Sequence, residues 1–413
     1  MKTHLGSSVA VSLALSLSCA LAQDPQALRT WVDQTGRTLK ARLLNVQGTN
    51  VVLQLENNTT ATVPLARFSN PDQSYVKGWA KGASKPDPTV VAKALKWPES
   101  AVVDVKKLQI VNGEQNAAAR RFVYQSGSFQ FTSNAALTGV VMREIAGDFE
   151  LVREFFAKVP WGWQPKPEGG GPLFLAELYE TQKDFINAGG DDQSSGWSKD
   201  GLIFTKFSTL GLKKVGERYA RDPKLSREGE MIGLITRLVM GDMRDLTLPW
   251  SALGLERFLE DVTYRNGAFQ LANPERGLKE MIANGQDLAP DVDGMLKLLH
   301  GSWAEDRGRE VVAIRRQNYF NGAMLIYFFG YLDGDGTGTR LHRYYQAMAQ
   351  DAMAFRNYRE ARKAGDNSVP NPKPNTSYPE WAASLNTHVI DGRSDEQLRT
   401  EIVAKYKAIG IKM

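Results

Sequence analysis

The segment that decides the fold of this chain is residues 230–240, EMIGLITRLVM. Apolar side chains recur along it with the i, i+3, i+4, i+7 spacing of one helical face. The sequence therefore predicts a helix that buries this stripe against the rest of the molecule. The residues of the stripe are Met231, Leu234, Ile235, Leu238 and Val239.

Two further strings flank this helix, and their order and spacing matter more than either string alone. Residues 208–216, STLGLKKVG, precede it, and residues 250–258, WSALGLERF, follow it. Over roughly residues 125–360, the arrangement resembles a secreted bacterial gluzincin-like peptidase domain of unknown function. In that family an LGxKKVG string precedes a His-Glu-x-Thr-His helix, and a Trp-x-x-Glu-Gly-x-Ala-Glu-Tyr segment supplies the third zinc ligand.

The residues that this family uses for zinc are missing from the matching positions. The helix reads Gly233-Leu234-Ile235-Thr236-Arg237, so the two histidines fall on Gly233 and Arg237 and the catalytic glutamate on Leu234. The third ligand falls on Leu253. A catalytic zinc needs three protein ligands, with one position open for water. Because glycine and leucine offer no donor atom and arginine would repel a dication, the resemblance implies no catalytic residue, no metal and no other cofactor.

The resulting hypothesis is a secreted, non-catalytic pseudo-metallopeptidase kept for binding a peptide or protein. One alternative is an ordinary core helix whose likeness to a zinc helix is accidental. Another is an active secreted hydrolase or peptidase with an unrecognised site, although there is no Gly-x-Ser-x-Gly elbow and the three later histidines stand far apart. Glu256 and Glu260 share one helical face, which fits either an acid/base pair or, more simply, a solvated surface.

Residues 29–76 carry short alternating apolar and polar runs separated by turn signals, which predicts small antiparallel strands with one buried face. The segment resembles the SLA-one homology domain, first type, a Src-homology-three-like β-barrel. The resemblance implies a protein- or ligand-binding module; eukaryotic members are associated with protein bridging, cytoskeletal partners and ubiquitin. Trp31 and Tyr75 would either line a binding groove or fill the barrel core. The matching residues are Arg29, Trp31, Gly36, Ala41, Val51, Leu53, Val63, Pro64, Leu65, Asp72, Tyr75 and Val76.

The predicted fold class is α+β, with a small N-terminal barrel and a larger zincin-like mixed domain that ends in helices. Strands are expected at 121–124, 129–131, 173–176 and 202–204, and helices at 137–159, 320–329, 341–363 and 394–409. The expected parts are a signal peptide at 1–22, the barrel at 23–80, a linker and lead-in at 81–120, the degenerate peptidase domain at 121–363, and a Pro/Asn-rich loop with a C-terminal helix at 364–413.

Two other motifs could be interpreted as ligand-binding sites, but each also has a simpler structural interpretation. Trp161 and Trp163 could stack on a sugar, but a tryptophan pair before a Pro/Gly turn is more typical of core packing. Asp333 and Asp335 look like the start of a calcium loop. The run 333–339, DGDGTGT, lacks the third acidic ligand and the terminal glutamate, so it predicts a turn between helices.

The charge of the chain limits the partners that can be expected, and its N-terminal sequence indicates the cellular compartment. The chain has 51 basic and 46 acidic residues among 413, with no basic stripe, so no nucleic-acid partner is expected. An apolar core at 9–17 and the small residues of Ala20-Leu21-Ala22 predict a cleaved secretory signal and a secreted or periplasmic protein. The single cysteine, Cys19, lies inside that signal. No later run is long enough to span a bilayer, and the oligomeric state stays open.

Overall fold

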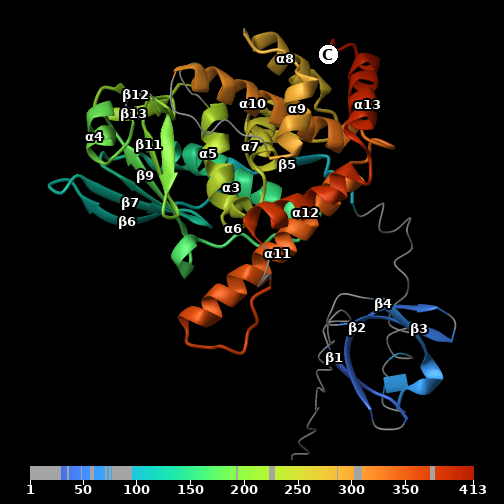
Figure 1. Cartoon of the computed structure of the whole chain (residues 1–413). Coiled ribbons are helices and arrows are strands. Elements are labelled where there is room, and N and C mark those ends of the chain that lie inside the picture. Colours follow the sequence, from blue (N-terminus) through green and yellow to red (C-terminus); the bar gives the residue numbers. More distant parts are fainter. Residues whose placement is uncertain are drawn as a thin grey trace, which may run out of the picture. The chain divides into compact units, whose positions relative to one another are not determined.

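The computed structural model describes residues 29–34, 37–47, 49–55, 60–69, 72–73, 76, 95–191, 194–222, 228–285, 287–301, 309–372 and 377–413. The chain divides into two compact units, residues 1–91 and residues 92–413 (Figure 1). The predicted signal segment, 1–22, and Tyr75 lie outside the described residues.

The N-terminal unit is a four-stranded antiparallel sheet. Its strands are β1 (Arg29–Val32), β2 (Thr38–Gln47), β3 (Asn50–Leu55) and β4 (Thr60–Pro64), followed by the short helix η1 (Leu65–Arg67). The predicted alternation is confirmed, since Ala41, Leu43, Val51 and Leu53 are buried while Arg42 is exposed. The predicted closed barrel is not found: in the described part of this unit the strand order runs β1-β2-β3-β4 without closing.

An ion pair ties β1 to the segment that follows the sheet. Arg29 Nη2 donates to Asp72 Oδ1 at 2.5 Å, and the backbone N–H of Val32 donates to Asp72 Oδ2 at 2.7 Å. The Asp72 side chain is only 4% exposed. The Arg29 guanidinium also lies 4.8 Å from the ring centroid of the buried Trp31. Several residues of the sequence match therefore hold the sheet together.

Replacing Asp72 with alanine should loosen this sheet, because a partly buried guanidinium and a backbone N–H would lose their acceptor. The expected loss is about 2 kcal/mol, measured as faster hydrogen exchange of the β1–β4 amides in the full chain. Arg37→Ala is the control, since its ion pair with Asp33 leaves the arginine 76% exposed and such pairs contribute little. Equal exchange rates in the two variants would contradict the assigned role of Asp72.

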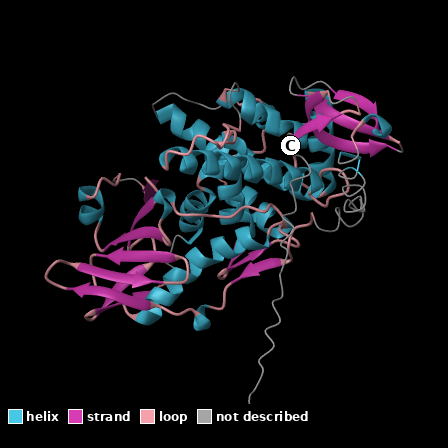
Figure 2. Cartoon of the chain, turned by 90° about the horizontal axis from the view of Figure 1, so that it is seen from below, coloured by secondary structure: helices cyan, strands magenta, loops and turns pink. Residues whose placement is uncertain are grey.

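The second unit is built on a six-stranded sheet with the order β10-β11-β9-β8-β7-β6. Strands β8, β9 and β11 run parallel, whereas β6, β7 and β10 are antiparallel to their neighbours. In Figure 2 these strands gather at one end of the unit and helices fill the rest. The bounds are β6 (Val111–Asn116), β7 (Arg121–Gln125), β8 (Phe129–Ser133), β9 (Phe174–Tyr179), β10 (Gly196–Lys199) and β11 (Leu202–Lys206).

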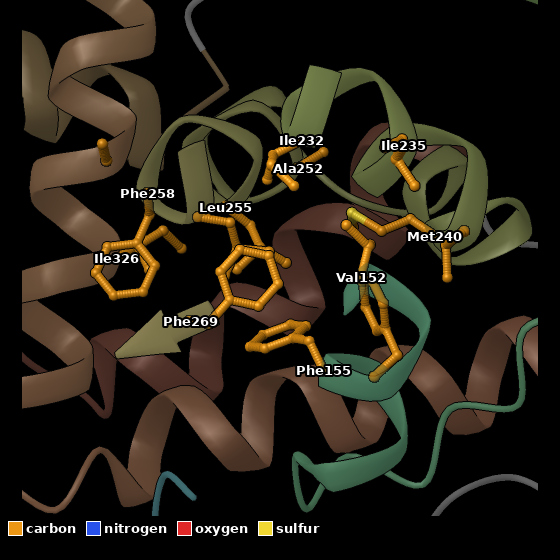
Figure 3. Packing of buried hydrophobic residues seen from close by; sticks show 14 of the residues in the cluster. Val152, Phe155, Ile232, Ile235, Met240, Ala252, Leu255, Phe258, Phe269 and Ile326 are labelled. Atoms are coloured by element: carbon orange, nitrogen blue, oxygen red, sulfur yellow. The ribbon is translucent and has the colours of Figure 1, made fainter. Parts of the chain in front are cut away.

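Two helices join this sheet to the rest of the core. Helix α3 (Gly139–Lys158) begins at Thr138, whose hydroxyl accepts from the Val141 N–H, and it connects β8 to β9. Phe149 of α3 meets the rings of Phe129 and Phe131 edge-on at 5.2 and 5.0 Å. Helix α5 (Glu228–Met240) contacts α3 and the strands β10 and β11. Figure 3 shows Ile232 and Ile235 of α5 in one apolar core with Val152 and Phe155 of α3.

The remaining helices form the C-terminal part of this unit. Helix α7 (Pro249–Arg257) crosses α10 (Arg309–Tyr327) at Gly254 and Gly322, where a Cβ on Gly254 would lie 2.6 Å from the Gly322 carbonyl. Helix α11 (Thr339–Lys363) contacts α6 (Asp242–Asp245) and α12 (Tyr378–Ile390). The other helices are α4 (Gln182–Asn187), α8 (Glu275–Asn284), α9 (Val292–Leu299) and α13 (Asp395–Ala408), with single turns or π-helical ends at Val105–Lys107, Glu168–Gly170, Phe258–Thr263 and Phe328–Leu332.

Short strands complete the second unit. The strand β5 (Ser100–Val102) pairs with β15 (Ala268–Gln270), which in turn pairs with β14 (Tyr264–Arg265). A separate hairpin joins β12 (Leu212–Val215) to β13 (Arg218–Arg221). No helix in the described ranges has both the length and the apolar character needed to cross a membrane.

Candidate functional site

Helix α5 carries three of the four positions matched to the zinc site. Met231, Ile235, Leu238 and Val239 are buried as the apolar stripe predicts, while Leu234 is only half-buried. The Leu234 side chain lies against the sheet edge, because a Cβ on Gly196 of β10 would be 2.8 Å from its Cδ1. The fourth position, Leu253, is a buried residue of α7. The hydrocarbon side chains at 234 and 253 cannot bind a metal ion.

Arg237 is held by a buried carboxylate from α7. Its Nη2 donates to Glu256 Oε2 at 2.7 Å and its Nε to Glu256 Oε1 at 3.3 Å, a two-pronged contact. The Glu256 side chain is 4% exposed, and Arg244 Nε lies 3.6 Å from its Oε1. Burial alone would lower the pKa of Arg237, but the charge and hydrogen bonds of Glu256, with help from Tyr319, raise it overall. The guanidinium is therefore a permanent cation at the position matched to the second histidine.

Gly233 faces a second carboxylate, Glu260, in the π-helical segment Phe258–Thr263 that follows α7. A Cβ at Gly233 would lie 3.0 Å from Glu260 Oε2 and 3.9 Å from Glu256 Cβ. Glu260 contacts Arg257, whose Nη1 donates to its Oε1 at 3.2 Å. Burial, and then the charge of the neighbouring Asp261, raise the pKa of Glu260 to about 8. The prediction of a solvated face for Glu256 and Glu260 is therefore wrong, because the two helices turn both carboxylates inward.

The raised pKa of Glu260 makes stability depend on pH. A carboxyl whose pKa is higher in the folded than in the unfolded chain binds its proton more tightly when folded. The stability that proton binding by Glu260 gives the folded chain is therefore fully present below the unfolded pKa of about 4.5. It is lost as the pH rises through the folded pKa of about 8. Asp261 acts in the same direction, because burial raises its pKa too, while Arg257 opposes both shifts.

Substituting Glu260 with glutamine removes this titration. The melting temperature of Glu260→Gln minus that of the native chain should increase as the pH is raised from 5 to 9. Thermal melts of both proteins at pH 5, 7 and 9 measure the difference. A difference that stays constant across this range would show that Glu260 is not the titrating group.

A cleft opens beside the C-terminal end of α5, with a volume of about 820 Å³. Arg237 is the one zinc-site position that lines it; Gly233, Leu234 and Leu253 do not. The cleft therefore adjoins the helix that carries three of the matched positions. Its walls are the Pro/Gly-rich loop 165–172, the β10–β11 turn at 198–201, residues 237–245 and the end of α11 at 356–363.

Four arginines and two carboxylates meet along this cleft. Arg356 Nε donates to Asp242 Oδ2 at 2.6 Å, and Arg359 pairs with the other oxygen of the same carboxylate. Glu256 accepts from Arg237 through both oxygens, and Arg244 Nε lies 3.6 Å from its Oε1. Sequence reasoning missed the pair Asp242 and Arg356, because the two residues are 114 positions apart and no local pattern joins them.

The tryptophans of the Trp161-Gly162-Trp163 segment are structural, as the simpler interpretation predicts. Trp161 and Trp163 are 1% and 4% exposed, and their indole N–H groups donate to His342 Nδ1 and to the Val239 carbonyl, both at 3.0 Å. The Arg356 guanidinium lies 4.4 Å from the Trp163 ring centroid. Trp163 thus helps to position an arginine of the cleft.

Trp31 and Asp333, the first aspartate of residues 333–339, also have structural roles. Trp31 is fully buried, and its Nε1 donates to the Ala41 carbonyl at 3.0 Å, so the indole has no exposed surface to line a groove. Asp333 is buried and pairs with Arg340 and Arg393, and its segment connects two helices as predicted. Within the described ranges, no three His, Cys, Asp or Glu side chains are grouped so as to hold a metal ion.

Comparison with known families gives a match within the N-terminal unit. Residues 21–83 match the model of the family SLA1 homology domain 1, SHD1. This SHD1 match covers all four strands of the first sheet and suggests a protein-binding module. Comparison with curated proteins gives no match for the chain.

Proposed function

We propose that this chain is a non-catalytic binding protein, in which a pseudo-metallopeptidase unit is joined to the SHD1 module. The observation that carries the proposal is the contact between Arg237 and Glu256. At the position matched to a zinc-binding histidine, the chain has a cation whose nitrogens lie 2.7 and 3.3 Å from a buried carboxylate. The positive charge that a metal ion would supply there is supplied by the protein.

The order of the elements supports descent from a zincin-like lobe. Such a lobe is expected to run strand, helix, strand and then the metal-binding helix; β8, α3, β9 and α5 occur in that order, with α4 and the strands β10 to β13 between β9 and α5. Helix α5 also lies against β10, the antiparallel edge strand of the sheet. Arg237, the one matched position that lines the cleft, is thus on a helix beside a sheet edge, where a bound peptide could reach it.

The residues present do not fit zinc. A catalytic zinc needs three nitrogen, oxygen or sulfur ligands around one point. The matched ligand positions are a glycine, an arginine and a leucine, and the two nearby carboxylates, Glu256 and Glu260, are engaged with Arg237 and Arg257. We therefore assign no hydrolytic step to this unit.

The test is a peptide-cleavage assay with the full chain. Incubation with a mixed peptide library, with added zinc and separately with a chelator, should leave every peptide intact by mass spectrometry. An unrelated zinc peptidase under the same conditions serves as the positive control. Cleavage that the chelator abolishes would overturn the proposal and favour the active-hydrolase hypothesis.

For the first unit, we propose that the SHD1 module binds a protein partner. We also propose that the chain is exported through its N-terminal segment and acts in the periplasm or outside the cell. If export is correct, protein recovered from the producing cells should begin near Gln23 when its N-terminus is sequenced. A full-length N-terminus would contradict export.

A further inference from the structure

The cleft beside α5 has more positive than negative charge at its floor. Four arginines lie there, Arg237, Arg244, Arg356 and Arg359, and the carboxylates Asp242 and Glu256 are each bridged by two of them. A third carboxylate, Asp245, lines the cleft and interacts with Arg244 and Arg359. The other charged lining residues balance one another: Lys166, Lys199 and Lys363 against Glu168, Asp200 and Glu360. The cleft is therefore left with an excess of one positive charge.

One arginine of this floor is fixed in place and still lacks an acceptor. The Arg356 side chain is 7% exposed and is held by Asp242, by the Gln164 carbonyl at 2.8 Å and by the face of Trp163. Its Nη2 is buried and has no hydrogen-bond partner among the described residues, and the same is true of Arg244 Nε. A buried donor without an acceptor is costly, so an oxygen atom from a ligand would be stabilised here.

We infer that this cleft binds a carboxylate-bearing peptide. A guanidinium fork matches the two oxygens of a carboxylate, and a recessed site with excess positive charge concentrates anions. A cleft of about 820 Å³ has room for a few residues of an extended chain. The inference rests on the proposed function, because it names the ligand class of the same cleft.

The four arginines come from different helices that line the cleft. Arg237 of α5 and Arg244 of α6 line the cleft together with Arg356 and Arg359 of α11. A carboxylate between these helices would accept hydrogen bonds from more than one of them. Arg244 and Arg359 are the more exposed of the four, at 37% and 42%.

The experiment uses the full chain and three labelled hexapeptides, with binding followed by fluorescence anisotropy. The first is C-terminally amidated hexaglutamate, the second is hexaglutamine with a free C-terminal carboxylate, and the third is amidated hexaglutamine. Binding of the first assigns the site to acidic side chains, and binding of the second assigns it to a chain terminus. The third should not bind. Binding should weaken as salt is raised, and failure of both carboxylate peptides would overturn the inference.

A matched pair of variants locates the site. Arg244→Gln with Arg359→Gln should weaken binding at least tenfold, because both changes reduce the positive charge of the cleft. Arg399→Gln is the control: its side chain is 39% exposed and paired with Asp293 of α9, and it does not line the cleft. If the double variant binds as tightly as the control, the peptide sits elsewhere and the inference fails.

The outcomes also separate this inference from the proposed function. Mass spectrometry of the recovered peptide shows whether it was cut. Binding followed by cleavage would uphold the carboxylate site and overturn the non-catalytic proposal. Intact peptide with no binding would overturn the carboxylate site alone.

Discussion

Replacing Arg237 with methionine is expected to lower the free energy of unfolding of the second unit by about 3 kcal/mol, because removing one partner leaves a buried charge uncompensated. Glu256 is 3% exposed and cannot turn to water, and its remaining partner, Arg244, is 3.6 Å away. Replacing Glu256 with methionine should cost less, because the Arg237 side chain is 27% exposed and retains access to solvent. Urea denaturation of the two variants measures the difference.

The double variant Arg237→Met/Glu256→Met is the control that isolates the pair. Two apolar side chains of similar length can replace a buried ion pair with little loss. We therefore expect its stability to lie within about 1 kcal/mol of the native chain. An Arg237→Met protein as stable as the double variant would mean that the buried carboxylate does not depend on Arg237.

The second large loss of stability is expected from replacing Gly254 with valine, where α7 crosses α10. A Cβ on Gly254 would lie 2.6 Å from the carbonyl carbon and oxygen of Gly322, so valine at 254 must force the two helices apart. We expect a loss of about 3 kcal/mol or more, which corresponds to a fall of about 4 °C or more in melting temperature for a unit of this size. The shift would also displace Glu256, which follows two positions later on the same helix.

Gly233→Ala is the matched control for that substitution. Its Cβ would meet only the end of the Glu260 side chain, at 3.0 Å, and alanine gains about 1 kcal/mol of helix propensity over glycine. We expect a change of less than about 1 kcal/mol in either direction. If the two variants have the same melting temperature, the close approach of Gly254 and Gly322 does not hold α7 in place.

Elements with a regular apolar period could be predicted from the sequence. The helix at 137–159 and the strands at 121–124 and 129–131 are confirmed, because their buried positions recur at 3.6 or 2 residues. The strand β6 was not predicted, since all six of its residues, VNGEQN, are exposed and give no alternation. Helix α12 was also missed. Its start carries a readable signal, a capping box formed by Ser377 and Glu380, which the surrounding Pro/Asn-rich composition obscured.

The helix that carries most of the candidate site could be predicted, but the contacts of its residues could not. The sequence placed Gly233, Leu234 and Arg237 on one helix, and the structure confirms that helix. It could not show that Glu256 and Glu260 turn inward, because an i, i+4 pair of glutamates is equally typical of a solvated face. The partner of Arg356, at Asp242, depends on how α6 meets α11, which is set by tertiary packing alone.

The central claim is that Arg237 stands where a metal ion would otherwise bind, and elemental analysis of the purified full chain tests it most directly. The account predicts far less than one zinc per chain after dialysis against buffer containing zinc, and a melting temperature that does not change when zinc or a chelator is added. One equivalent of zinc that stabilises the protein, and that Glu256→Met abolishes, would contradict it.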